Sequence, residues 1–377
     1  MRASRICAVA VVLVGLVILS AAPALGAGSS RLQRQIDGLV AAKGGPPGVI
    51  VTVRRGSRTR VLTSGVRDLR SRKALHSWHH MRIASVAKAF SGAVALRLVA
   101  NRRLRLEDTI SGVLPDMPRA WANVKVKQLL NHTSGLPDYT KSAGFGRQFE
   151  TDPDGYVSPG TIVDWVRPEP LVFPSGTGYR YSNTDNIVVG LMAERVTGRP
   201  YGRLLRDHVF RPLKLRRTSF PSSPPLPRPF IHGYLVDDDG GPPEDVSTLL
   251  SPSGAWASGA IVSTPRDLNT FIRGYLGGRL FPRRLRRQQL RFVKGGESSP
   301  PGPGTNSAGL AVFRYRTKCG TMYGHTGNFP GYVQFAAASR HGSRSVTTTL
   351  NIPAPEGALL AQLRTMQRTA VCAALAR

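Results

Sequence analysis

The stretch "RIASVAKAF" (residues 82–90) sets Ser85 three residues before Lys88. It opens an apolar run to residue 104 that predicts a buried helix beginning near Ser85. Residues three apart share a helix face, with Cβ atoms about 5–6 Å apart. Lys88 can take the proton of Ser85 if burial lowers its pKa from about 10.4, and the apolar neighbours favour burial. A helix N-cap serine beside a surface lysine explains the same letters, so the pair needs support from elsewhere in the chain.

A second polar group lies in "GYRYSNTDN" (178–186). Tyr181 and Asn183 are two residues apart and point to the same side if this segment is extended. A phenol and a carboxamide can then enter one cleft. The alternative is a loop in which the two side chains make only local hydrogen bonds.

A third group lies in "YGHTGNFPGY" (323–332), between two strand patterns. His325 and Thr326 offer hydrogen-bond donors for a carboxylate from a sheet edge. Gly327 lets a bound substrate come close to the backbone. The three letters H-T-G carry little information by themselves, and an ordinary strand edge explains them.

Together the motifs S-x-x-K, Y-x-N and H-T-G, in this order, form the signature of the serine penicillin-recognising enzymes. The chain resembles that superfamily, specifically the branch of class C β-lactamases and secreted serine-type D-Ala-D-Ala carboxypeptidases. The resemblance runs from about residue 31 to the C-terminus. It includes four further segments, "VKQLLNHTSGLPDY" (126–139), "FPSGTGYRYSNTDNIVVGLMAERVTGRPY" (173–201), "RPLKLRRTSF" (211–220) and "SGAIVSTPRDLNTF" (258–271).

The resemblance implies a role for each catalytic candidate. Ser85 attacks an acyl carbonyl and becomes the acyl-enzyme. Lys88 and Tyr181 share the proton transfers, and which of them is the base stays open. The backbone N–H groups of Ser85 and Asn328 form the oxyanion hole.

The resemblance also implies how substrate is bound. Asn183 hydrogen-bonds the amide side chain of the substrate, and Thr326, with His325 and Gly327 beside it, receives the substrate carboxylate. Histidine at position 325 is typical of the secreted carboxypeptidase type, whereas β-lactamases usually carry lysine there. Another cation can replace the missing charge, and the candidates are Arg314 and Arg316. Solvated arginines on an edge strand are the alternative.

The order of the patterns predicts an α+β fold. Strand patterns lie near both chain ends and helical patterns lie between them, so we expect an antiparallel sheet built from both termini. Helices at the two ends flank this sheet lobe (about 28–84 and 250–377), and a mostly helical lobe (about 85–249) is inserted. The resemblance places a disulfide between Cys319 and Cys372, which join a strand to the last helix.

The first residues predict export. Arg2 and Arg5 precede an apolar run over 6–19 and then small residues, so residues 1–27 fit a cleavable secretory signal, with an uncleaved membrane anchor as the alternative. The formal net charge of the 377 residues is +30. It attracts anionic partners, for which anionic cell-wall polymers or lipid head groups are the candidates and nucleic acid is not. The basic run 279–296 reads as a solvated helix or as such a polymer site.

These observations predict a secreted serine hydrolase that cleaves D-Ala-D-Ala peptides of peptidoglycan through an acyl-serine, as carboxypeptidase or transpeptidase. The alternatives are a class C-like β-lactamase acting on β-lactams, an esterase or D-amino-acid amidase, and a non-catalytic wall-binding protein. We expect a monomer without cofactor. "HSWHH" (76–80) lacks the spacing of a metal site, and no G-x-S-x-G elbow occurs.

Overall fold

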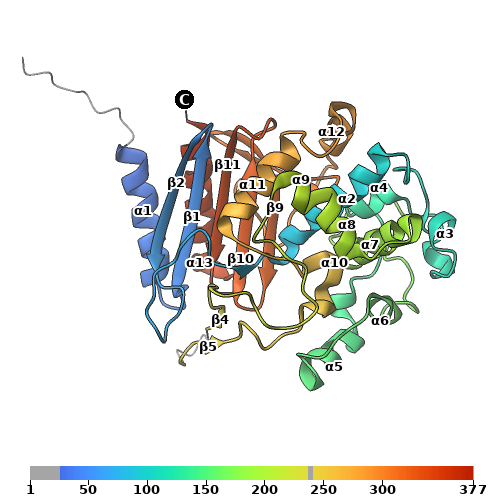
Figure 1. The fold of residues 1–377 in the computed structure, drawn as a ribbon, viewed down its shortest axis with the longest axis horizontal. Coiled ribbons are helices and arrows are strands. Elements are labelled where there is room, and N and C mark those ends of the chain that lie inside the picture. Colours follow the sequence, from blue (N-terminus) through green and yellow to red (C-terminus); the bar gives the residue numbers. More distant parts are fainter. Residues whose placement is uncertain (1–25, 237–240, 377) are drawn as a thin grey trace, which may run out of the picture.

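The computed structural model describes residues 26–236 and 241–376. Its centre is a seven-stranded sheet with the order β2-β1-β11-β10-β9-β8-β7 (Figure 1). Every neighbouring pair is antiparallel. The strands are β1 (Gly48–Arg55), β2 (Arg58–Gly65), β7 (Thr305–Gly309), β8 (Val312–Thr317), β9 (Gly320–Phe329), β10 (Tyr332–Ala338) and β11 (Arg344–Leu350).

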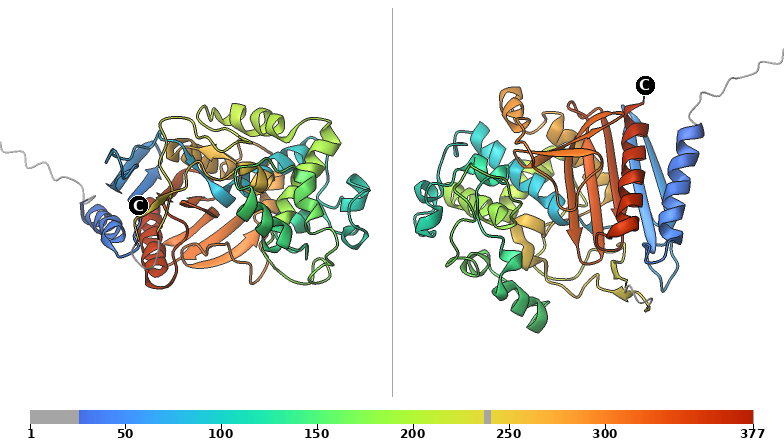
Figure 2. Two further views of the ribbon diagram at one scale, coloured as in Figure 1. Left: turned by 90° about the horizontal axis from the view of Figure 1, so that it is seen from below. Right: turned by 180° about the vertical axis from the view of Figure 1, so that it is seen from behind.

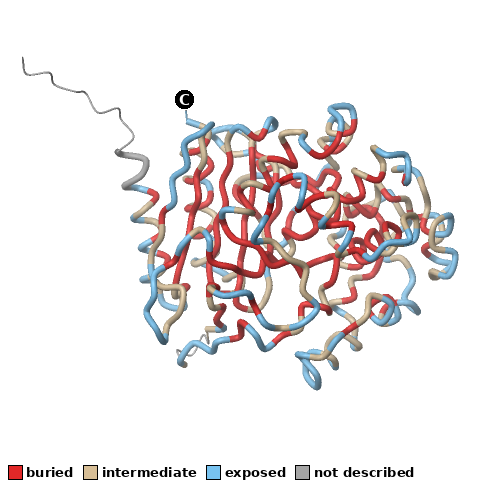
Figure 3. The backbone as a smooth tube through the Cα atoms, in the orientation of Figure 1, coloured by how far each residue is buried: buried red, intermediate tan, exposed pale blue. Residues whose placement is uncertain are grey.

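The pairing of β1 with β11 joins the first hairpin to the last strands, which confirms the prediction of a sheet built from both chain ends. The strands β10 and β11 are buried along almost their whole length. A sheet that is buried on both faces must be covered by helices on both sides. Figure 3 shows these buried residues running through the sheet and on into the helical part of the molecule.

One face of the sheet is covered by helices α1 (Gly26–Ala41) and α13 (Gly357–Leu375), which come from opposite ends of the chain and lie side by side (Figure 2). In α1 the spacing of Leu32, Ile36 and Leu39 places all three on the buried side. They pack with the sheet and with the last helix in one apolar cluster. The helices from the two ends of the chain therefore form one layer against the same face of the sheet.

The other face carries α2 (Ala87–Ala100) and α11 (Pro265–Leu276), with the helical part beyond them. The residues of α2 are buried nearly all round, as its continuous apolar sequence predicts. The remaining α-helices are short except for α7, and they are α3 (Ile110–Val113), α4 (Val126–Leu130), α5 (Ala143–Thr151), α6 (Pro159–Asp164), α7 (Thr184–Thr197), α8 (Tyr201–Leu205), α9 (Arg211–Leu213), α10 (Trp256–Gly259) and α12 (Arg283–Gln289).

Single-turn elements and two small sheets complete the described chain. The turns are η1 (Ala84–Val86), η2 (Arg119–Trp121), η3 (Tyr139–Lys141) and η5 (Pro252–Ala255), and η4 (Arg206–Phe210) is a π-helical segment between α8 and α9. The small sheets pair β3 (Met81–Arg82) with β6 (Val262–Ser263) and β4 (Tyr234–Leu235) with β5 (Glu244–Asp245). The basic run 279–296 forms only the short helix α12, whose Arg283, Arg284 and Arg287 are exposed.

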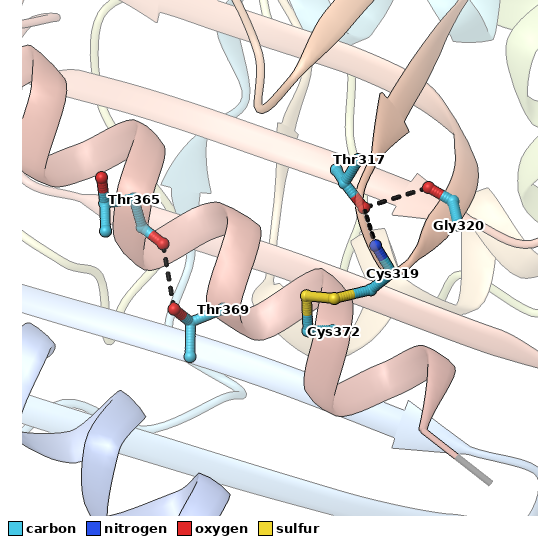
Figure 4. Close-up of a disulfide and its surroundings, with 6 residues drawn as sticks. All are labelled: Thr317, Cys319, Gly320, Thr365, Thr369 and Cys372. Carbon is cyan, nitrogen blue, oxygen red and sulfur yellow. Dashed lines mark hydrogen bonds between the residues drawn. A yellow bond between two sulfur atoms is a disulfide. The ribbon is translucent and has the colours of Figure 1, made fainter.

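Cys319 and Cys372 form a disulfide that ties the turn between β8 and β9 to α13 (Figure 4). Their Cα atoms are 5.2 Å apart. Residues 1–25 of the predicted signal segment lie outside the described residues, and its last two residues begin α1. In the described part of the chain, no helix combines the length and apolarity that crossing a bilayer requires.

Candidate active site

Ser85 lies in the turn η1, directly before α2. The preceding residue, Ala84, has a φ of 51°, a left-handed conformation that a residue with a Cβ rarely adopts. Such strain costs on the order of 1–3 kcal/mol and persists only where the surrounding structure holds it. Both residues line a cavity of about 550 Å³, so the strained turn presents the Ser85 hydroxyl to that cavity.

Lys88 is buried beneath Ser85, with 1% of its surface exposed. Its Nζ atom lies 2.9 Å from Ser85 Oγ, 2.7 Å from Asn183 Oδ1 and 2.9 Å from the carbonyl oxygen of Ser258. Burial lowers the pKa of Lys88 from 10.5 to about 7, although the carboxyl groups of Asp138 and Asp185 act in the raising direction. The amine is therefore available as a base near neutral pH.

The three neighbours also fix the direction of the amine lone pair. A neutral amine has two N–H donors and one lone pair. Asn183 Oδ1 and the Ser258 carbonyl can only accept, so they take the two N–H groups. The lone pair is then left for the hydroxyl proton of Ser85. This geometry suits proton removal from Ser85 by Lys88.

Asp138 fixes the orientation of the Asn183 amide. Asn183 Nδ2 lies 3.1 Å from both carboxylate oxygens of Asp138. A carboxylate only accepts, so the amide must turn its nitrogen to Asp138 and its oxygen to Lys88. The backbone N–H of Thr140 also donates to Asp138 Oδ1, at 3.2 Å. Asp138 therefore holds the acceptor that orients Lys88.

Tyr181 closes the other side of the amine, and its ring centre lies 5.2 Å from Lys88 Nζ. Its hydroxyl is buried and forms no hydrogen bond with the residues that the structure describes. Burial raises the pKa of Tyr181 well above 10, although the nearby Ser85 hydroxyl acts in the lowering direction. The phenol keeps its proton at neutral pH and can donate it.

The edge of β9 lies against the Ser85 turn. Strand β8 pairs with β9 only as far as Gly324, so the following residues have no strand partner on that side. A Cβ built on Gly327 would lie 2.7 Å from the Ile83 carbonyl oxygen and 3.0 Å from the Ser85 nitrogen. Only glycine permits this approach. It places the backbone of β9 beside the backbone N–H of Ser85.

The side chains of His325 and Thr326 lie beneath the cavity surface and do not line it. Burial and the charge of Lys88 lower the pKa of His325 to about 3, so its ring is neutral. Its Nε2 atom is buried and has no hydrogen-bond partner in the described part of the chain. Thr326 Oγ1 donates to the Pro300 carbonyl oxygen at 2.7 Å. Asn328 does line the cavity.

A comparison with protein families places this geometry in a known group. The family model described as Beta-lactamase matches residues 32–368, nearly the whole described chain. The chain belongs to the β-lactamase family. It is a serine hydrolase of that family, and its sheet with flanking helices is the fold of its structural neighbours.

The solved structures most relevant to this β-lactamase-family chain are two amidohydrolases. A D-stereospecific amidohydrolase from Streptomyces sp. is 30% identical, with a TM-score of 0.77, and the match covers 86% of this chain and 94% of that chain. The D-amino acid amidase from Ochrobactrum anthropi SV3, in complex with D-phenylalanine, is 26% identical, with a TM-score of 0.80, and the match covers 92% and 98%.

Curated relatives match over shorter stretches. Penicillin-binding protein 4* of Bacillus subtilis is 24% identical over 71% of this chain and 60% of its own length. A putative D-alanyl-D-alanine carboxypeptidase of Escherichia coli K12 is 27% identical over 37% of this chain and 33% of its own length. The chain thus spans between a third and three fifths of these relatives.

Arg314 and Arg316 lie away from the cavity. The structure therefore corrects the prediction that one of them supplies a cation beside the substrate carboxylate. Arg314 donates to Ser307 Oγ at 3.0 Å and lies over the Phe292 ring, 4.7 Å from its centre. Arg316 is exposed on the same strand. Neither lines the cavity, because β8 ends its pairing with β9 before the strand reaches Ser85.

Sequence reasoning assigned no role to a buried pair beside Tyr181. His132 Nδ1 lies 2.7 Å from Asp185 Oδ2, and the His132 ring centre is 4.4 Å from that of Tyr181. Burial lowers the pKa of His132 to about 3 and raises that of Asp185 well above 3.8. Both groups are driven to their neutral forms. A neutral pair can pack against the buried phenol of Tyr181 without placing a charge beside it. The feature of the sequence that could have indicated this pair is the polar stretch "NHTSG" (131–135), which follows apolar residues.

The histidine-rich segment contributes nothing to this site. Its rings pack on Trp78, with the His76 ring stacked 4.1 Å from the indole. Within residues 26–236 and 241–376, no group of three or more His, Cys, Asp or Glu side chains is arranged to hold a metal ion.

Proposed function

We propose that the protein hydrolyses amides and esters of small D-amino acids through an acyl group on Ser85. The observation that carries the proposal is the composition of the cavity. Its wall is largely apolar and aromatic, with Tyr139, Phe145, Phe149, Val157, Trp165, Leu250 and Phe329. Such a wall suits the side chain of one apolar or aromatic residue.

The charges on the same wall favour a substrate with a free amino group. Asp138 is the one carboxylate among the described residues that line the cavity, and no arginine lines it. Among the described residues Asp138 Oδ2 accepts a hydrogen bond only from Asn183, which leaves acceptor capacity for an ammonium group. The D configuration is taken from the two amidohydrolases to which this fold is similar.

In the proposed reaction Lys88 removes the proton of Ser85 while Oγ attacks the substrate carbonyl carbon. The N–H groups of Ser85 and Asn328 receive the developing oxyanion. Tyr181 then protonates the leaving amine or alcohol as its bond to the carbonyl carbon breaks, and it recovers a proton through Lys88. Water next attacks the acyl-enzyme, which releases the acid and restores Ser85.

A D-Ala-D-Ala carboxypeptidase is the second candidate. Lys141 lines the cavity and is exposed, so it can meet a C-terminal carboxylate there. The matches to a penicillin-binding protein and a putative carboxypeptidase support the same possibility. Export through the amino-terminal segment belongs to this proposal, since peptidoglycan lies outside the cytoplasm.

A panel of four substrates tests the choice: the p-nitroanilides of D-phenylalanine, L-phenylalanine and N-acetyl-D-phenylalanine, and a diacylated peptide ending in D-Ala-D-Ala. We expect the first to have the highest kcat/KM. Preference for the peptide would support the carboxypeptidase instead. Rapid turnover of a labelled penicillin would indicate a β-lactamase, and reaction with none of these would refute hydrolysis of this class.

The variant Asp138→Asn removes the charge but keeps an oxygen that can accept from Asn183. We expect kcat/KM for the free-amino substrate to fall by on the order of 10- to 100-fold, the range for loss of one hydrogen bond between charged groups. The rate for N-acetyl-D-phenylalanine p-nitroanilide should change less than about threefold. Asp138→Leu, which also frees the Asn183 amide, should lower both rates. Equal losses for both substrates in Asp138→Asn would contradict recognition of the amino group.

The pH dependence of kcat/KM should report Lys88. A base must be deprotonated to act, and burial lowers the pKa of Lys88 to about 7. Below that pH the rate should fall about tenfold for each pH unit, and above it the rate should level off. The measurement is kcat/KM between pH 5 and 10 with an N-acetylated substrate, whose own amine does not titrate. A flat profile through pH 7 would show that Lys88 is not the base.

A further inference from the structure

A second cavity, of about 820 Å³, lies outside the catalytic site. It is formed beside α9 and the amino-terminal end of α11, two helices that contact each other (Figure 1). Ten residues line it: Trp78, Leu213, Lys214, Arg216, Arg217, Thr264, Arg266, Asp267, Thr270 and Arg279. None of them lines the catalytic cavity. Its occupant is therefore independent of the substrate proposed above.

The wall of this basic cavity is strongly positive. Five of its ten residues are Lys or Arg, against 52 of 377 in the whole chain, so the concentration exceeds the general excess of arginine. All five are exposed, and none forms an ion pair within the described residues. The single carboxylate, Asp267, accepts from the Arg217 backbone N–H at 2.8 Å and from Thr218 Oγ1 at 3.0 Å.

Side chains, not the helix end, would bind an anion here. The first-turn N–H groups of α11 are already used, because Arg266 N donates to the Ser77 carbonyl oxygen and Asp267 N to Thr264 Oγ1. None of the five side-chain cations is paired with a carboxylate in the described part of the chain. They repel one another across the cavity, and an anion with several charges relieves that repulsion better than a single small ion.

Trp78 adds an apolar surface to the cavity. Its side chain is 44% exposed although tryptophan is usually well buried. The indole is stacked on His76 at 4.1 Å with 8° between the ring planes, and Arg217 Nη1 donates to the Trp78 carbonyl oxygen at 3.0 Å. A fixed, exposed indole beside cations suits a ligand with C–H groups between its charges.

We propose that the basic cavity binds a polymer in which phosphate groups link polyol or sugar units. The phosphates lie on the cations and the carbon units lie on Trp78. The volume of the cavity accommodates more than one phosphate group. A polymer can therefore place several of its phosphates near the cations at once, which increases its affinity. An anionic cell-wall polymer has this chemistry, and an anionic lipid surface and single-stranded DNA are the competing anions that the test must separate.

The test titrates the full-length protein with poly(glycerol phosphate) and follows tryptophan emission and binding heat at low and moderate salt. We expect binding that weakens as salt rises. The triple variant Arg216→Gln, Arg266→Gln and Arg279→Gln should bind on the order of 10- to 100-fold more weakly. The matched control removes three charges from α12 with Arg283→Gln, Arg284→Gln and Arg287→Gln and should bind within about threefold of the wild type. Hydrolysis should be unchanged in both variants.

Trp78→Leu should abolish the change in emission, because Trp121 and Trp256 are buried and Trp165 lines the catalytic cavity instead of the basic one. Absence of binding by the wild type would overturn the proposal. Equal weakening in the two triple variants would also overturn it, since general charge would then explain the attraction. Equal or tighter binding of single-stranded DNA or of phosphatidylglycerol vesicles, lost in the same variant, would reject the polyol phosphate as ligand.

Discussion

Replacing Lys88 by methionine is expected to lower kcat/KM by about 10³-fold or more while the fold is retained. The amine lies 2.9 Å from Ser85 Oγ, and general base catalysis contributes about 10²- to 10⁴-fold. Methionine is unbranched and fits a space shaped for a lysine stem. The measurement is steady-state hydrolysis of a p-nitroanilide by purified wild type and variant.

Lys141→Met is the matched control, because Lys141 also lies at the cavity but is exposed and does not contact Ser85. Its rate with the N-acetylated substrate should stay within a few-fold of wild type. If Lys88→Met kept more than about a tenth of the wild-type rate, Lys88 would not be the base. Tyr181 would then have to accept the proton, although burial raises its pKa.

For Lys88→Met we expect stability to change in the opposite direction to activity. The pKa of Lys88 is about 7 in the folded protein and near 10.5 when unfolded. Between these values the unfolded chain binds more protons, so the stability of the wild type rises with pH from about 7 to 10.5. Methionine does not titrate. Lys88→Met should therefore melt at or above the wild-type temperature at pH 7, with a smaller advantage near pH 10.

Replacing Gly327 by alanine is expected to lower kcat by about 10²- to 10³-fold, which is the usual effect of losing one oxyanion donor. The new Cβ would lie 2.7 Å from the Ile83 carbonyl oxygen and 3.0 Å from the Ser85 nitrogen, both backbone atoms. The β9 edge must then move away from the Ser85 turn. That movement separates the N–H groups of Ser85 and Asn328.

Gly38→Ala is the control, since no atom lies within 4 Å of the position of its Cβ in the surface helix α1. It should leave kcat unchanged. Circular dichroism and the melting temperature should show that Gly327→Ala remains folded. Wild-type kcat in folded Gly327→Ala would show that the close approach of β9 to Ser85 is not needed for catalysis.

The sequence predicted the parts of the site that are fixed by short-range spacing. Ser85 and Lys88 share one helical turn, and Tyr181 and Asn183 lie in one short segment, so spacing alone predicts each pair. The structure brings the two pairs together at Lys88. The architecture followed in the same way from strand patterns at both chain ends. Resemblance to one family supplied the order in which distant motifs combine.

What the sequence did not predict depends on contacts between distant segments. Asp138 acts on Lys88 through Asn183, 45 residues further along the chain, and no local pattern links the two. The prediction for Arg314 was wrong because the alternation of side chains along β8 indicates which face of the sheet a residue lies on. It does not indicate where the pairing of β8 with β9 ends. The buried state of His325 depends on packing against Phe313, with ring centres 5.0 Å apart.

The most direct test of the account is to identify the residue that becomes acylated. The protein is mixed with a labelled penicillin or a p-nitrophenyl ester, quenched in acid, digested and mapped by mass spectrometry. We predict one adduct, on the peptide that contains Ser85, and none with Ser85→Ala, which should also be inactive. An adduct on a different residue, or hydrolysis by Ser85→Ala at the wild-type rate, would contradict the acyl-serine mechanism.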